Sequence, residues 1–121
     1  MCGYFFYSFV ISLNRSVPIY YIQYEARPNP ESEDFATCGG AFISCWLNSD
    51  SELLAKQIAA KSIHEYCWDI LSVEEDAREV SEDDYPEDKE SRERCWQASV
   101  DGECYVFDTW RNEPQQESER H

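Results

Sequence analysis

Two sets of side chains in this sequence have the types and spacing that could do chemistry, and the first is a histidine–cysteine pair. His64 and Cys67 have an H-x-x-C spacing near the end of a predicted helix, which suits metal ligands. Four further cysteines could complete such a site: Cys38, Cys45, Cys95 and Cys104. Structural zinc sites normally bring ligands in closely spaced pairs, and the second pair is missing here. The helical angle also places His64 on the polar face, so we predict a solvated histidine, buried thiols and no metal.

Nucleophilic catalysis finds equally little support. A reactive cysteine needs a neighbouring base, and the only histidines are His64 and His121, neither of which the sequence places beside a thiol. Carboxylates are too numerous to identify an acid–base pair without evidence of burial. There is no GxGxxG loop, and Gly39-Gly40 indicates only a turn. We therefore predict no catalytic residue and no cofactor.

The second set is an acidic segment, residues 74–84, with the sequence EEDAREVSEDD. Its seven acids are Glu74, Glu75, Asp76, Glu79, Glu82, Asp83 and Asp84. With the single Arg78, seven minus one gives a local net charge of −6. We expect a flexible surface connection here, which would not imitate the rigid phosphate rows of a duplex. The seven carboxylates are our candidate for contact with a partner.

Overall composition limits the class of partner. The chain has 121 residues, 42% of them hydrophobic and 15% aromatic, which suits one folded domain. Ten Lys and Arg against 25 Asp and Glu give a net charge of −15, which disfavours nucleic acid and anionic membranes. Basic proteins or cations are the partners that this charge favours. Six cysteines without a CxxC spacing, three of them in apolar stretches, predict a reduced, cytoplasmic protein.

The two ends differ from the middle of the chain. Residues 4–13, YFFYSFVISL, form an apolar run with no preceding Lys or Arg and no Ala-x-Ala-like cleavage site, and the run is too short to span a bilayer. An extra terminal strand, or an extension translated from upstream of the usual start, explains it better than a signal peptide. We predict an N-terminal extension over 1–17, one domain over 18–111 and a polar tail over 112–121.

Hydrophobic periodicity predicts four strands and two helices between these ends. Alternation predicts strands at 19–26 and 103–110, and apolar runs predict strands at 41–47, buried on both faces, and at 68–73. A helix begins where Ser49 and Glu52 have capping-box spacing and runs to about residue 66, and a crossover of this length favours parallel strands on either side of it. A second helix is predicted over 86–100, with Asp88–Arg92 and Glu90–Arg94 pairs and a stop at Asp101-Gly102.

The predicted fold is an α+β sandwich. It has a mixed sheet of four or five strands with two helices packed on one face, related to the ferredoxin-like plan. Trp46, Trp68 and Trp110 lie at strand positions that are expected to pack in the core. Trp96 is the exception, because it lies on the charged second helix beside Cys95.

Three segments resemble a group of small acidic bacterial proteins of unassigned function. The matching segments are YYIQYEA-x-P at 20–28, GAFI-x-CWL at 40–47 and CYVF-x-TW at 104–110. The resemblance covers about residues 19–110 and leaves the N-terminal apolar run outside it. It implies domain limits and no catalytic residue, because no activity is attached to that group.

Three functions fit these observations. The first is a non-enzymatic binding or inhibitory protein, of the immunity or phage-antagonist type, which engages a basic protein surface through its carboxylates. The second is a small ligand-binding domain or enzyme, with a pocket between sheet and helices and with groups such as Tyr24 or Glu25 in use. The third is a housekeeping domain that forms a homodimer through an exposed strand edge.

Overall fold

A computed structural model describes residues 17–112 of the chain. Its elements in chain order are β1 (Ile19–Pro28), β2 (Cys38–Asn48), α2 (Glu52–Glu65), β3 (Trp68–Val80), the 3₁₀ turn η1 (Glu82–Asp84), α3 (Lys89–Asp101) and β4 (Glu103–Arg111). The N-terminal apolar run, its predicted strand and most of the predicted tail lie outside the described residues.

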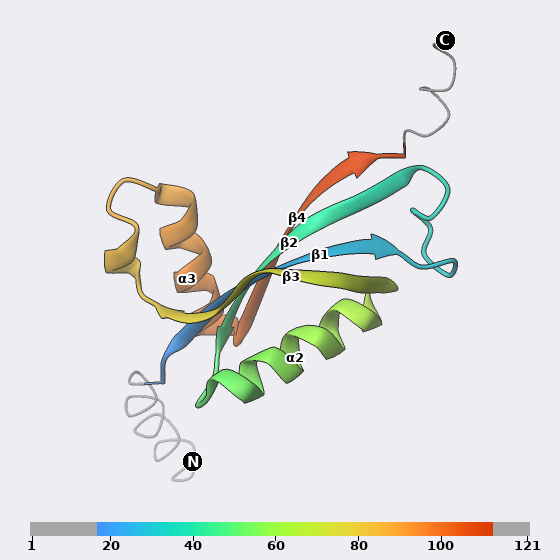
Figure 1. Cartoon of the computed structure of the whole chain (residues 1–121). Helices are drawn as coiled ribbons and strands as arrows, with labels where there is room; N and C mark the ends of the chain where they lie inside the picture. The colour runs from blue at the N-terminus through green and yellow to red at the C-terminus, as the bar shows by residue number, and fades with distance from the viewer. Residues whose placement is uncertain (1–16, 113–121) are drawn as a thin grey trace, which may run out of the picture.

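The four strands form one antiparallel sheet in the order β3-β1-β2-β4 (Figure 1). The α+β class, with four strands and two helices, is confirmed. β2 and β3 both run antiparallel to β1, so these two strands point in the same direction, as predicted. β1 lies between them, however, and the sheet is therefore antiparallel at every pair of neighbours instead of mixed. The ferredoxin-like relation remains a prediction.

One face of the sheet is covered by α2. The small buried residues Ala55 and Ala59, together with Ile63, bring this helix close to the sheet. Its buried partners lie on β1, β2 and β3 and are Ile22, Tyr24, Ala26, Ala41, Ile43, Cys45, Leu47 and Trp68. Each fully buried aliphatic side chain of this kind contributes about 1.5–3 kcal/mol to folding. The alternation predicted for strand 19–26 and the apolar stripe predicted for the first helix are what form this core.

The opposite face carries α3, so our prediction that both helices pack on one face is wrong. Tyr21 and Trp46, whose neighbours in sequence point toward α2, pack instead with Cys95 and Ala98 of α3. Figure 1 shows the two helices on opposite sides of the sheet. The physical reason is that β2 is apolar on both faces, as predicted, and a second apolar face needs its own cover.

Local boundaries also differ from the predicted ones, at the start of both helices and at the end of β3. The N-cap of α2 is Ser51, whose hydroxyl accepts the N–H of Leu54 at 3.1 Å, while Ser49 bonds to the Ser51 backbone and shapes the preceding turn. α3 begins at Lys89 instead of Pro86, because Asp88 caps it by accepting the N–H of Ser91 at 3.0 Å. β3 runs seven residues past the predicted end, from 73 to Val80.

Gly39 and Gly40 lie within β2 and do not form the predicted turn. A Cβ on Gly40 would lie 2.6 Å from a ring carbon of Trp110 and 3.0 Å from the carbonyl oxygen of Ala26. The Trp110 ring therefore occupies the space above this glycine and also packs on Phe42, with the ring centroids 5.1 Å apart. Trp110 stays 38% exposed, which places it at the edge of the sheet and outside the core where we predicted it.

Candidate functional site

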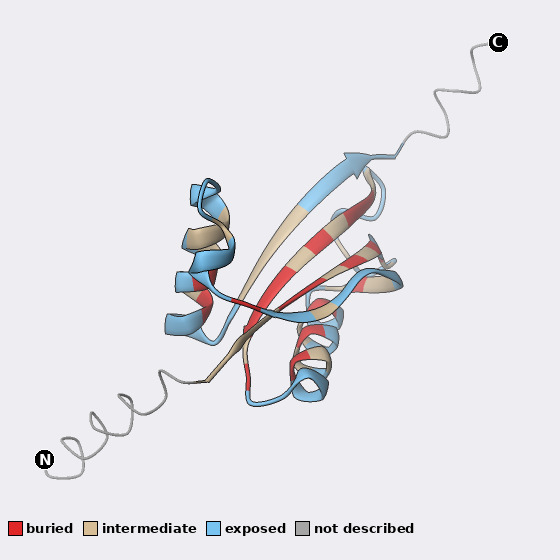
Figure 2. Ribbon diagram, turned by 60° about the vertical axis from the view of Figure 1, so that its left-hand side comes forward, coloured by how far each residue is buried: buried red, intermediate tan, exposed pale blue. Residues whose placement is uncertain are grey.

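The acidic segment is built into regular structure, which corrects our expectation of a flexible loop. Residues 74–80 belong to β3, where Glu75 lies opposite Gln23 and Val80 opposite Ile19. Partly buried Ala77 and buried Val80 anchor this half of the strand, one on each face of the sheet. Figure 2 shows most of β3 exposed beside the buried central strands.

The three acids of η1 are held by a capping box. The Ser81 hydroxyl accepts the N–H of Asp83 at 3.2 Å, and the Asp84 carboxylate accepts the N–H of Ser81 at 2.7 Å. This reciprocal pair satisfies two donors that the start of a short helix would leave unpaired. All seven candidate carboxylates therefore lie on a strand or in a capped turn.

Two of the seven carboxylates are neutralised by ion pairs. Glu75 meets Arg78 at 3.0 Å, and Asp76 meets Lys56 of α2 at 3.1 Å. The N–H of Ala77 and then Lys56 hold the pKa of Asp76 below its usual range. Within residues 17–112, no ion pair engages the other five, Glu74, Glu79, Glu82, Asp83 and Asp84. The segment keeps a net negative charge that is available to a partner, and this charge is spread over both faces of β3 and the turn η1.

An exposed aromatic residue lies beside this acidic turn. Trp96 is 56% exposed, as its place on the charged helix suggested, and it lines a shallow hollow of about 300 Å³. The other lining residues are Glu82, Lys89, Arg92 and Glu93. Tryptophan is among the residues that most often anchor protein interfaces. Trp96 is therefore an apolar contact point at the border of the acidic segment, in a hollow that two acidic and two basic residues line together.

The charge pairs predicted on the second helix are replaced by other contacts. Arg92 donates to the carbonyl oxygens of Tyr85 and Pro86, at 2.9 and 3.0 Å, and so ties the helix to the turn before it. Asp88 accepts both the N–H and the hydroxyl of Ser91. The second predicted pair, Glu90 with Arg94, is not among the ion pairs of the described residues.

The histidine and cysteine side chains do not come together. His64 is exposed on α2, while Cys67 is half-buried after the helix end. Five cysteines of the described chain are free, namely Cys38, Cys45, Cys67, Cys95 and Cys104, and Cys2 lies outside the described residues. Across residues 17–112 no group of three or more His, Cys, Asp or Glu side chains could hold a metal ion.

Burial makes the deepest thiols poor nucleophiles. Burial, followed by the nearby Glu82 and Asp84, raises the pKa of Cys95 to about 11. Burial likewise raises the pKa of Cys45 far above its usual range. The thiolate is the reactive form of cysteine, so these two side chains serve the core.

Tyr24 and Glu25, which we considered as pocket groups, lie on opposite faces of the sheet. Tyr24 is buried against α2, where burial raises the pKa of its hydroxyl. Glu25 is half-buried opposite Phe42 on the other face. The structure therefore does not bring these two groups into one site.

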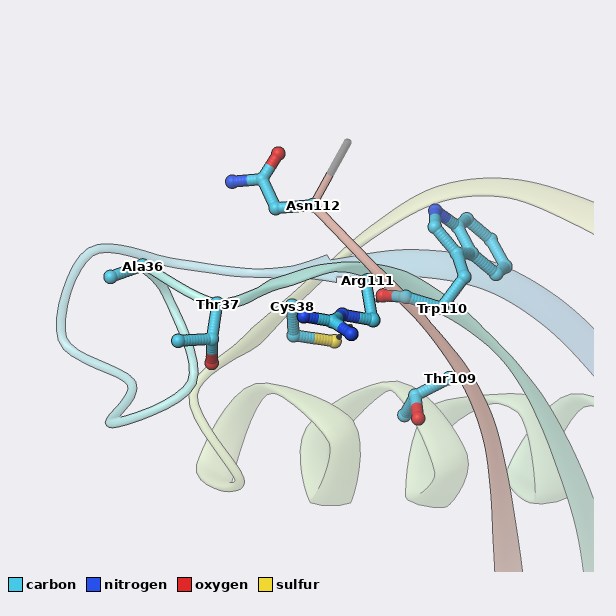
Figure 3. A pocket seen from close by; sticks show the side chains of 7 residues that line it. All are labelled: Ala36, Thr37, Cys38, Thr109, Trp110, Arg111 and Asn112. Carbon is cyan, nitrogen blue, oxygen red and sulfur yellow. Dashed lines mark hydrogen bonds between the residues drawn. The ribbon is translucent and has the colours of Figure 1, made fainter. Parts of the chain in front are cut away.

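Two further hollows were not foreseen from the sequence. The first, of about 430 Å³, is shown in Figure 3, where the Cys38 thiol donates to the carbonyl oxygen of Trp110 at 3.5 Å. It is lined by Ala36, Thr37, Cys38, Thr109, Trp110, Arg111 and Asn112, and so borders the last described residue.

The second hollow, of about 320 Å³, lies at the C-terminal end of α2. Its lining residues are Asp34, Tyr66, Trp68, Phe107 and Thr109. Phe107 lies 5.4 Å from Trp68 and 5.7 Å from Tyr66 between ring centroids, with steep angles between the ring planes. These residues come from four separate segments, which the sequence alone did not bring together.

Comparisons with known proteins do not assign a function to these residues. No protein family, curated protein or solved structure matches the chain. The resemblance to small acidic bacterial proteins therefore stays a prediction. In residues 17–112 no helix is long and apolar enough to cross a membrane.

Proposed function

We propose that this chain is a non-enzymatic binding or inhibitory protein, of the immunity or phage-antagonist type, that engages a basic protein surface in the cytoplasm. The supporting observation is that Trp96 lines one hollow with Glu82, whose carboxylate forms no ion pair within residues 17–112; Lys89, Arg92 and Glu93 complete the lining. A Lys or Arg of a partner can approach both the carboxylates and the face of the indole.

The structured setting of the carboxylates favours this function over simple solubility. Side chains on a strand and a capped turn lose little backbone freedom when a partner binds, so less of the interaction energy is spent on ordering. Electrostatic attraction from a chain of net charge −15 would also speed association with a basic surface.

The test is a comparison of two variants with the same change in charge. The first, Glu79→Gln/Glu82→Gln/Asp83→Asn, removes three carboxylates from the acidic segment, and the second, Glu31→Gln/Glu33→Gln/Asp50→Asn, removes three exposed carboxylates elsewhere. Both variants and the wild type are used as bait in low-salt extracts of the source cells. We expect one basic protein that the wild type and the second variant retain and the first variant loses.

Two further readouts follow from the same binding mode. Trp96→Ala should also weaken capture, and raising the salt concentration should release the partner. Equal retention by both triple variants would contradict the proposal, because it would show that net charge alone, and not the acidic segment, retains basic proteins.

A second candidate function, a small ligand-binding domain, is favoured by the hollow between α2 and β4. Its three aromatic rings and the Asp34 carboxylate suit a small alkylammonium compound, and the C-terminal end of α2 adds a partial negative charge. Choline and its neutral isostere 3,3-dimethylbutan-1-ol provide matched probes. Saturable NMR shifts with choline alone would support this function, and none at about 10 mM would remove it.

A further inference from the structure

The hydrogen-bond pattern shows which main-chain groups of β4 face out of the sheet. Asn48 donates its N–H to the carbonyl of Gly102 at 2.9 Å, and Leu47 lies opposite Glu103. Bonded pairs alternate along an antiparallel ladder. The even-numbered residues of β4 therefore bond to β2, and the odd-numbered residues present their N–H and C=O groups outward: Glu103, Tyr105, Phe107, Thr109 and Arg111.

The other edge of the sheet, β3, is closed to a further strand. From Asp69 to Arg78, ten residues of β3 pass alongside seven of β1, with three register shifts. Its outward main-chain groups are therefore unevenly spaced, and the strand carries four of the candidate carboxylates. Bulges and charges are the devices by which native sheets prevent edge-to-edge pairing.

β4 has neither form of protection. It pairs one-to-one with β2 from Glu103 to Trp110, and the only register shift between these strands lies at the far end, between Cys38 and Gly40 of β2. Its two acids and one Arg give it a net charge of −1. In both Figure 1 and Figure 2, β4 is the outermost strand of the sheet, and α3 stands beside its first half.

We propose that the β4 edge pairs with β4 of a second copy of this chain, antiparallel about a two-fold axis at Phe107. This register places Glu103 of each copy opposite Arg111 of the other, so the ends carry two cross-strand ion pairs. Phe107 meets Phe107 of the second copy on the face that α2 covers. Five outward residues on each strand would exchange about ten main-chain hydrogen bonds.

Neighbouring registers lack this complementarity. A two-fold axis at Asp108 would place the two Asp108 carboxylates directly opposite each other, which is destabilising. An axis at Val106 would place Glu103 opposite Thr109 and leave Arg111 beyond the strand of the other copy. Charge therefore selects Phe107 as the centre and a second copy as the partner.

The first test is the mass of the full chain in solution as a function of concentration, by light scattering. We expect twice the monomer mass of 14.2 kDa for the wild type. Thr109→Pro removes an outward N–H that β2 does not use, so the fold should survive while the dimer is lost. Thr109→Val keeps the N–H and is the matched control, with circular dichroism to show that all three chains fold.

A charge exchange tests the register. Arg111→Glu places two Glu pairs across the interface and should weaken the dimer about tenfold. The double variant Glu103→Arg/Arg111→Glu should restore it. Because Glu103 also accepts hydrogen bonds from Ser62 and Tyr105, thermal unfolding of the double variant must confirm that it folds.

The results separate this proposal from the proposed function. Two copies of net charge −15 repel at low salt, so the dimer should strengthen toward about 0.15 M salt, whereas binding to a basic partner should weaken. A wild type that stays monomeric at about 1 mM, or a Thr109→Pro chain that still dimerises, would overturn the pairing. Failure of the folded double variant to recover would overturn the register.

Discussion

The ends of the two helices offer a test of backbone strain that needs no knowledge of function. After α2 the chain turns through Cys67 at a φ of 70°, and after α3 it turns through Gly102 at a φ of 94°. A residue with a Cβ costs about 1–2 kcal/mol in this left-handed region, and glycine avoids the cost. The left-handed conformation is therefore relaxed at Gly102 and strained at Cys67.

The strain is best measured as a difference between two substitutions at residue 67. Cys67→Gly and Cys67→Ala both remove the half-buried thiol, but only the glycine variant relieves the left-handed backbone. Glycine also loses about 0.5–1 kcal/mol through the greater freedom of its unfolded chain. We therefore expect the Cys67→Gly chain to be more stable than the Cys67→Ala chain by about 0.5–1 kcal/mol.

Urea unfolding under reducing conditions, followed by tryptophan fluorescence, gives the free energy of unfolding of each chain. The reverse experiment, Gly102→Ala, should cost about 1 kcal/mol or more. Apart from the two adjacent residues, no heavy atom of residues 17–112 lies within 4 Å of the added Cβ, so a steric clash would not confuse the result. Equal stability of the two residue 67 variants would refute the strain argument, because their only relevant difference is the Cβ at a positive φ.

Three further predictions concern the core, the thiols and the acidic strand. Gly40→Ala should lower the free energy of unfolding by about 1–3 kcal/mol, because the new methyl group meets the Trp110 ring and the Ala26 carbonyl. The loss should be smaller in a Trp110→Ala background, and an equal loss in both backgrounds would contradict this reasoning. The Cys95 thiol keeps its proton in the folded chain up to about pH 11 but loses it near pH 9 in the unfolded chain, so the free energy of unfolding should fall as pH rises between these values. Urea midpoints of Cys95→Ala should show a smaller fall over the same pH range than those of the wild type. Asp76 has a folded pKa that the Ala77 N–H and then Lys56 lower, so its stabilising effect is present above the unfolded value of 3.8 and is lost as pH falls through the folded value. Asp76→Asn should therefore reduce the loss of stability in acid. An unchanged acid limb would show that these two contacts do not favour the charged carboxylate.

The elements with clear hydrophobic periodicity were predictable from sequence. The alternating strand from Ile19 and the strand from Glu103 occur where the pattern predicted them, and α2 buries the predicted alanines. The second half of β3 was missed for a physical reason. Its acids have low strand propensity, and its bulges interrupt the two-residue alternation on which such a prediction depends.

The placement of α3 shows that two of our predictions were incompatible with each other. The apolar run AFISCWL predicted burial on both faces of the strand, which is incompatible with two helices on one face. Trp46 and Cys45, adjacent in that run, do pack against different helices. For the candidate site, the sequence identified the acidic residues and singled out Trp96, but the proximity of Trp96 to Glu82 depends on the course of the chain through η1.

The order of the strands also bears on how the chain is made. β2 emerges from the ribosome well before β4, its neighbour on one side, so the even-numbered main-chain groups of β2 have no partner until residues 103–111 have been synthesised. β2 is the most apolar strand of the sheet and has the regular spacing that intermolecular pairing requires. A premature stop at Gly102 would consequently leave a chain whose two helices are complete but whose central hairpin is open to aggregation, which makes the last strand a safeguard during biosynthesis as well as a part of the fold.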